Sequence, residues 1–230
     1  MGTSWQRREF NQWGLALCVA WLFGARSAQA DTLSSEQALR TLRLSLSQGA
    51  AASVRALGVS GGFWNQPSLR IGLPPTLERA QPVLKMLGQG HALDELRQGV
   101  NRAAEQAMPL ALPLLEQAIR GLQVRDAQAI LQGGDHAVTD YFARATRPAL
   151  TAKFLPEVSQ VTDQLGSARQ YDRLLQKARA LGVKGDDMAT HVTRGALDGL
   201  FKTIATQEQA LRQNPAQASS RLLREVFGRL

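Results

Sequence analysis

A polar cluster on one predicted helix has the residue types and spacing that could do chemistry. It comprises Arg97, Asn101, Arg102 and Glu105, in and just before the stretch NRAAEQA. At about 100° per residue, Arg97 falls at the edge of the apolar stripe and Asn101 lies a little further round. Arg102 and Glu105 face outward, three residues apart, where they can form an ion pair. Glu105, with Arg97 or Arg102, is the candidate for a carboxylate enzyme.

Structural roles explain the same cluster. If another helix covers this side, the four side chains form buried hydrogen bonds that fix the helix register. If none does, they form a solvated face. The functional alternative is a groove for a ligand or partner, with Tyr141 as a hydrogen-bond donor opposite the cluster.

A long predicted loop is the second candidate binding element. It runs from Gly58 to Pro75 and carries Phe63 and Trp64. Long ordered loops in compact domains are often functional, and exposed aromatic side chains there could contact a ligand or membrane. Large aromatic side chains are usually mostly buried, so we expect these two to fold back onto the bundle.

No cofactor or metal motif accompanies these candidates. The three histidines, His91, His136 and His191, lie in different segments without metal-ligand spacing. The chain has no G-x-S-x-G, no H-E-x-x-H and no phosphate-binding glycine loop. We therefore expect no metal and no cofactor, and whether the protein is an enzyme stays open, with a non-enzymatic role favoured.

The elements that must position these residues are predicted to be helices. Apolar residues recur at spacings of three, four and seven along most of the chain, and no stretch alternates long enough for a strand. The fold class is therefore all-α, a single helical bundle of about eight to nine helices over residues 31–230. Several of these helices are short or kinked by proline.

Proline and glycine set the expected helix boundaries. Pro109 and Pro113 should stand near the start of a helix, separate from the one that holds the polar cluster. Gly133 and Gly134 should separate two short helices, with Asp135 as the cap of the second. Pro148 should open a third helix.

The first thirty residues read as an export signal that is removed. Two arginines precede an apolar run at residues 13–25, and Ala28-Gln29-Ala30 is a small-x-small cleavage pattern. The run is shorter than the roughly 20 residues of a membrane span. We expect a periplasmic or secreted protein that uses the general secretory route, with RREF at residues 7–10 leaving twin-arginine export as the alternative. The single cysteine, Cys18, follows a large residue, which disfavours lipid attachment.

Removal of this segment takes three Arg and one Glu, so the net charge falls from +8 to +6. A moderately basic surface is compatible with peripheral membrane contact. The charges alternate in sign along the predicted helices, which indicates a solvated surface and disfavours nucleic acid.

Several stretches after residue 30 form a pattern that covers nearly the whole remaining chain. They are NRAAEQA (101–107), DAQAILQG (126–133), TDYF (139–142), KFLPEV (153–158), ALDGLFKTIA (196–205), and NP (214–215) followed by LLREVFG (222–228). In this order they resemble the bacterial family catalogued as domain of unknown function 4197. The resemblance implies an exported, mostly helical protein and supplies no reaction.

The functional expectation is an exported helical protein that binds a partner in the cell envelope or an amphipathic ligand. The candidate binding residues are those of the cluster and the aromatic loop: Phe63, Trp64, Arg97, Asn101, Arg102, Glu105 and Tyr141. The alternatives are an envelope enzyme that uses a carboxylate and a carrier of a lipid-like ligand.

Overall fold

The computed structural model describes residues 34–123, 127–179 and 187–229, all within one compact unit, Leu33–Leu230. The expected export signal at residues 1–30 lies outside the described residues. The elements are α1 (Ser35–Leu57), α2 (Pro75–Met86), α3 (Gly90–Arg120), α4 (Ala127–Leu131), α5 (Ala137–Gln164), α6 (Ser167–Arg179), α7 (Met188–Gln213), a 3₁₀ turn η1 (Pro215–Gln217) and α8 (Arg221–Phe227). The described residues contain eight α-helices and no strand, which confirms the all-α prediction.

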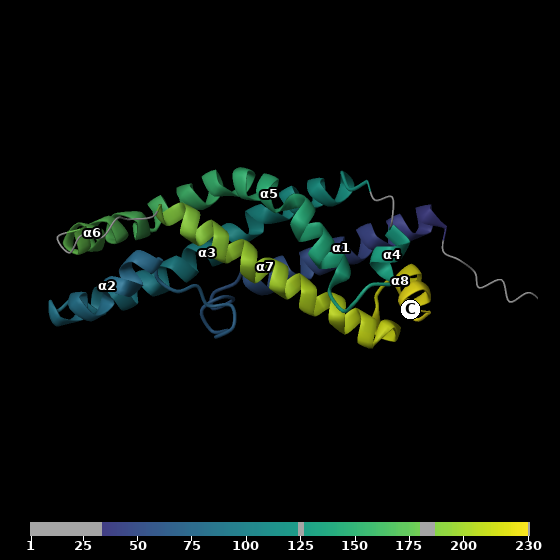
Figure 1. The fold of residues 1–230 in the computed structure, drawn as a ribbon, viewed down its shortest axis with the longest axis horizontal. Coiled ribbons are helices and arrows are strands. Elements are labelled where there is room, and N and C mark those ends of the chain that lie inside the picture. Colours follow the sequence, from purple (N-terminus) through teal and green to yellow (C-terminus); the bar gives the residue numbers. More distant parts are fainter. Residues whose placement is uncertain (1–33, 124–126, 180–186, 230) are drawn as a thin grey trace, which may run out of the picture. The chain divides into compact units, whose positions relative to one another are not determined.

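Four long helices form the body of the unit. The most extensive contacts join α5 to α7, α3 to α5, α1 to α7 and α1 to α3, so each of the four packs against two others. The short helices pack at the ends of this body: α2 and α6 against α3, and α4 and α8 against α1 (Figure 1). The loop between α1 and α2 lies beside α3 and α7 (Figure 1).

Helix starts follow the local sequence signals where a capping side chain is available. Ser34 and Gln37 form a reciprocal capping box at the start of α1. Asp187 caps α7 by accepting the backbone N–H of Thr190 at 2.7 Å. Ser and Asp are among the residue types preferred at helix starts.

The proline boundaries predicted from the sequence are wrong. Pro109 and Pro113 lie inside the continuous helix α3, and Pro148 lies inside α5. A proline removes one helical hydrogen bond, but a stripe of buried apolar residues continues past it and holds the helix to the core. In α3 this stripe includes Met108, Ala111 and Leu115 on both sides of the two prolines.

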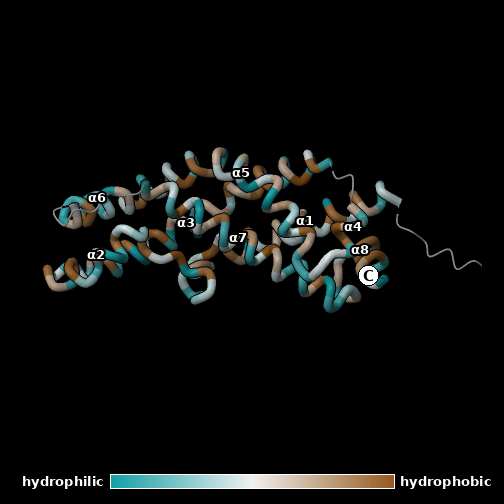
Figure 2. Tube along the Cα trace, viewed as in Figure 1, coloured by the Kyte–Doolittle hydropathy of each residue, from teal (hydrophilic) through white to brown (hydrophobic). Residues whose placement is uncertain are grey.

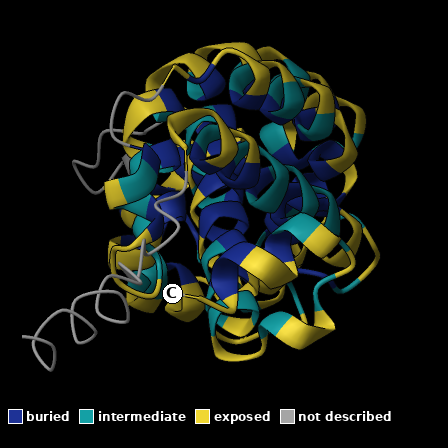
Figure 3. Ribbon diagram, turned by 90° about the vertical axis from the view of Figure 1, so that its right-hand side faces the viewer, coloured by how far each residue is buried: buried dark blue, intermediate teal, exposed yellow. Residues whose placement is uncertain are grey.

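The core lies between the long helices. Figure 3 shows buried residues in the interior and exposed ones on the outside, and Figure 2 shows the hydrophobic residues spread along all the helices. Phe63, Phe142 and Phe154 are among the largest fully buried side chains. The rings of Phe142 and Phe201 meet edge to face with centroids 6.0 Å apart, which joins α5 to α7.

Candidate functional site

Two members of the predicted polar cluster on α3, Asn101 and Glu105, are covered by the α1–α2 loop. Oε1 of Glu105 accepts the backbone N–H groups of Phe63 and Trp64, each at 3.0 Å. Glu105 is only 6% exposed, which corrects the prediction that it faces outward. The predicted ion pair between Glu105 and Arg102 is absent among the described residues. The carboxylate of Glu105 instead accepts hydrogen bonds from the loop backbone. Glu105 therefore anchors the loop.

Asn101, one turn earlier on α3, anchors the other end of the same loop. Its Oδ1 accepts the N–H of Ile71 at 2.8 Å, and its Nδ2 donates to the carbonyl of Ile71 at 2.8 Å. Nδ2 also donates to the carbonyl of Arg97. A side-chain amide that pairs with both backbone groups of one residue replaces the hydrogen bonds a strand or helix would give.

Helix α7 holds the loop from the other side. Phe63 and Ile71 lie against Gly199 and Gly195, where a Cβ atom would come within 2.5 Å and 2.8 Å of their side chains. Nε2 of His191 lies 2.9 Å from the carbonyl oxygen of Gly72. The two glycines leave room for the loop side chains, so the loop is packed as part of the core and Phe63 is fully buried.

The other predicted site residues lie apart from this anchor. Trp64 is half-buried, with the guanidinium of Arg70 4.6 Å from its ring centroid. Arg97 pairs with Asp94 at 2.8 Å, and Arg102 is exposed. Tyr141 is half-buried on α5 and lines a hollow between α3 and α5. The structure thus joins Phe63, Trp64 and Glu105 directly, and it does not place Tyr141 among the hydrogen-bond partners of the cluster.

A second buried carboxylate, Glu208 on α7, was not singled out by the sequence. It accepts the N–H groups of Val138 at 3.1 Å and Thr139 at 2.8 Å, and the hydroxyl of Thr139 at 2.7 Å. Its Oε1 also accepts Nε and Nη2 of Arg212 at 3.0 and 2.9 Å. Glu208 therefore caps α5 from another helix, which replaces the predicted capping role of Asp135.

Arg212 extends this network to the segment before α5. Its Nη1 donates to the carbonyl groups of Leu131 and Gly133, and its guanidinium carbon lies 5.4 Å from the ring centroid of Phe227 on α8. The partners of Glu208 on α5 lie about seventy residues away in the chain, so no local spacing rule points to its capping role. The only signal in the sequence is the Glu208–Arg212 spacing of four on a helix.

A recess lies beside this network, the α1–α7 groove, with a volume of about 520 Å³. Its walls come from α1, α7, the start of α5 and the η1 turn. Its lining includes Gln48, Gly49, Ala52, Arg55, Gln207 and Gln217. Gly49 brings the two long helices together at the floor, where a Cβ atom would lie 3.4 Å from Cγ2 of Ile204.

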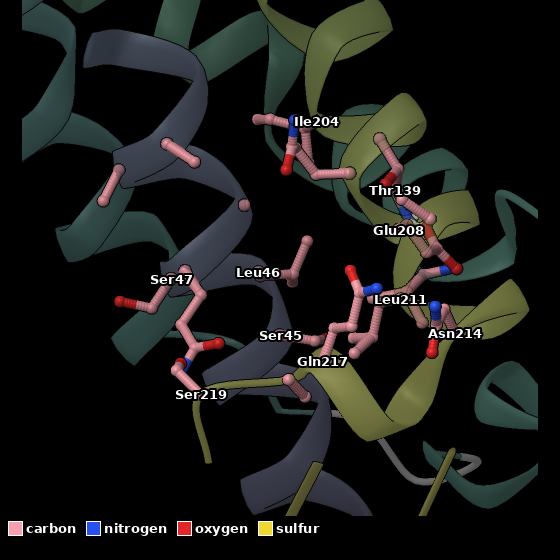
Figure 4. A pocket seen from close by; sticks show the side chains of 18 of the residues that line it. Ser45, Leu46, Ser47, Thr139, Ile204, Glu208, Leu211, Asn214, Gln217 and Ser219 are labelled. Atoms are coloured by element: carbon pink, nitrogen blue, oxygen red, sulfur yellow. Dashed lines mark hydrogen bonds between the residues drawn. The ribbon is translucent and has the colours of Figure 1, made fainter. Parts of the chain in front are cut away.

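The groove is lined mainly by uncharged polar and small side chains. Figure 4 shows Ser45 of α1 and Gln217 beside Leu211 and Asn214. Within the described residues, the side-chain amides of Gln48, Gln207, Asn214 and Gln217 make no hydrogen bond. Apart from the buried Glu208, Arg55 is the one charged lining residue. The groove therefore offers hydrogen-bond donors and acceptors and one positive charge.

Within residues 34–123, 127–179 and 187–229, no three His, Cys, Asp or Glu side chains gather as metal ligands would. None of the described helices is long and apolar enough to span a bilayer.

The all-helical fold of the described residues agrees with the mostly helical family that the sequence motifs resemble. The chain belongs to the family described as "Protein of unknown function (DUF4197)", whose model matches residues 32–228. No curated protein and no solved structure matches the chain.

Proposed function

We propose that this protein is a non-enzymatic binding module of the cell envelope, whose α1–α7 groove takes an extended segment of a partner protein. The observation that carries the proposal is the set of side-chain amides that line the groove without a partner among the described residues. The export signal expected at residues 1–30 supports the location in the envelope.

An extended peptide fits the chemistry of this groove. Its backbone presents alternating N–H and C=O groups, and each Gln or Asn amide can both donate and accept. Gly49 and Ala52 have small or absent side chains, so a peptide backbone can approach α1 closely. Arg55 favours a peptide with a carboxylate at that end of the groove.

Other ligand classes fit less well. The described lining includes no aromatic ring on which a sugar could stack, and its many amides are poor partners for an acyl chain. An enzyme that uses Glu105 is disfavoured because Oε1 of this carboxylate is engaged by two backbone N–H groups in a buried position. The network around Glu208 forms a fixed wall of the α1–α7 groove, since both carboxylate oxygens of Glu208 accept hydrogen bonds.

The test is selection of peptides from a random library on the immobilised unit, residues 33–230. Selected peptides are expected to bind, and Ala52→Phe, which fills the groove, should abolish their binding. Gln207→Ala and Gln217→Ala should each weaken it by about fivefold, because a hydrogen bond contributes about 1 kcal/mol.

Matched control substitutions lie on an exposed part of α5. Ala152 and Gln160 are exposed and do not line the groove. Ala152→Phe and Gln160→Ala should therefore leave the peptide affinity unchanged. Failure to select any peptide, or equal losses in the groove variants and these controls, would rule out the groove as a peptide site. A metabolite or lipid that co-purifies at a one-to-one ratio, detected by native mass spectrometry, would favour the carrier alternative.

A further inference from the structure

The turn between α2 and α3 exposes two large apolar side chains that the groove does not use. Met86 is 80% exposed and Leu87 is 58% exposed, the two highest values among the exposed large hydrophobic residues. They are adjacent in the chain, and Figure 2 shows hydrophobic residues at this end of α2. A soluble surface usually scatters such side chains singly, so an adjacent pair at a turn indicates a contact surface.

The turn is held in one conformation by its backbone. Gly88 has a φ of 74°, and the N–H of Gln89 donates to the carbonyl of Leu84 at 2.9 Å, as in a glycine-terminated helix. A hydrophobic contact often closes this type of helix end. Here the residue after Gly88 is the polar Gln89, and Met86 and Leu87 project outward.

A basic pocket lies directly beside the turn. The α3–α6 pocket has a volume of about 440 Å³ and is lined by Gln89, Glu95, Gln170, Arg173, Gln176 and Lys177, among others. Nζ of Lys177 donates to Oε1 of Gln89 at 2.7 Å, and Nε2 of Gln89 donates to the carbonyl of Leu87 at 3.2 Å. Gln89 therefore links the pocket to the backbone of the turn that carries the exposed pair.

The charge of this pocket favours an anion. Arg173 and Lys177 lie one helical turn apart on α6, and Arg173 forms no ion pair with a described residue. The single carboxylate of the pocket, Glu95, is engaged by Nδ1 of His91 at 3.2 Å and by Nε2 of Gln170 at 3.2 Å. With two cations and one carboxylate, the pocket keeps a net positive charge that favours a phosphate group.

We infer that the Met86–Leu87 turn and the α3–α6 pocket form a docking surface for a bilayer that contains anionic phospholipids. Met86 and Leu87 enter the boundary between headgroups and acyl chains, and Arg173 and Lys177 hold a lipid phosphate at the surface. Apolar insertion next to basic side chains is the combination that peripheral membrane proteins use, and neither part alone gives stable binding. This surface is separate from the α1–α7 groove, so it does not depend on the peptide proposal.

Vesicle sedimentation with residues 33–230 tests the inference, because this unit has its own core and lacks the apolar run of residues 13–25. We expect binding to vesicles of phosphatidylglycerol and phosphatidylethanolamine, weakened by salt, and none to phosphatidylcholine vesicles. The double variant Met86→Ser/Leu87→Ser should lower the partition coefficient by about tenfold. Arg173→Gln/Lys177→Gln should lower it by a similar factor and reduce its salt dependence.

Each variant has a matched control. Val59→Ser/Leu110→Ser removes exposed apolar side chains elsewhere. Arg102→Gln/Lys153→Gln removes an exposed arginine and a lysine that, like Lys177, donates to a glutamine. The controls should keep full vesicle binding, and circular dichroism melts should show that all variants fold. Absence of binding to anionic vesicles, or equal losses in variants and controls, would overturn the inference. Binding of soluble glycerol phosphate, with vesicle binding unchanged in Met86→Ser/Leu87→Ser, would also overturn it and assign the pocket to a soluble phosphate ester.

Discussion

The ring of Phe63 occupies the space that a side chain on Gly199 would need: a Cβ atom there would lie 2.5 Å from Cε1 of Phe63. Gly199→Ala should therefore destabilise the protein by about 1 to 3 kcal/mol, since added atoms in a full core force side chains from their rotamers. Thermal unfolding measures this loss. Gly134→Ala is the control, because a Cβ atom there meets nothing within 4 Å, and its melting temperature should stay near that of the wild type.

A double variant separates crowding at this contact from a general loss of helix stability. Phe63→Leu shortens the side chain that faces Gly199, so Gly199→Ala should cost less free energy of unfolding in that background than in the wild type. Strictly additive effects would mean that Gly199 and Phe63 do not interact energetically.

Glu105→Gln should loosen the α1–α2 loop. The substitution keeps the shape of the side chain and removes the charge that strengthens two backbone hydrogen bonds, which we expect to cost about 1 to 3 kcal/mol. For a domain of this size the melting temperature falls by roughly 2 to 4 °C per kcal/mol. Trp64 is the one tryptophan after residue 30, so acrylamide quenching of its fluorescence should rise in the variant.

Arg102→Gln is the comparison for this experiment, because Arg102 is exposed on the same helix and has no partner among the described residues. Its effect should be within about 0.5 kcal/mol. An unchanged melting temperature in Glu105→Gln, together with loss of a measured turnover, would instead support the carboxylate enzyme.

Glu208→Gln should be more damaging than any exposed ion-pair substitution. It leaves the guanidinium of Arg212, whose side chain is only 12% exposed, without its carboxylate and weakens the cap of α5, for an expected loss of about 3 kcal/mol. Thermal melts again give the size of the effect. Hydrogen exchange at Val138 and Thr139 should accelerate, because their N–H groups donate to Glu208.

The pair of Arg221 and Glu225 provides a control with the same spacing of four residues in an exposed position. Exposed pairs contribute little because solvent and salt screen them, so Glu225→Gln should leave the melting temperature nearly unchanged. Equal effects of Glu208→Gln and Glu225→Gln would refute the capping role of Glu208.

The sequence predicted the fold class well because helical periodicity is a local signal. The long loop after α1 was identified correctly, and the family resemblance is confirmed. Proline positions were misleading, because tertiary packing of α3 and α5 overrides the local cost of Pro109 and Pro148.

The site was predicted less well because its contacts join distant segments. The helical wheel identified Asn101 and Glu105 as unusual, but it could not show that a loop some thirty to forty residues earlier supplies their partners. Glu208 was missed for the same reason. The α1–α7 groove depends on the packing of the first and last long helices, which no spacing within either one reveals.

The most direct test of the groove proposal is an NMR titration of residues 33–230 with the tightest selected peptide. The account predicts the largest amide shift changes at Gln48, Gly49, Ala52, Gln207 and Leu211, which line the groove. The indole N–H of Trp64, on the separate loop, should not shift. Changes centred on Trp64 and Arg70, with the groove amides unaffected, would contradict the account and return the binding site to the aromatic loop.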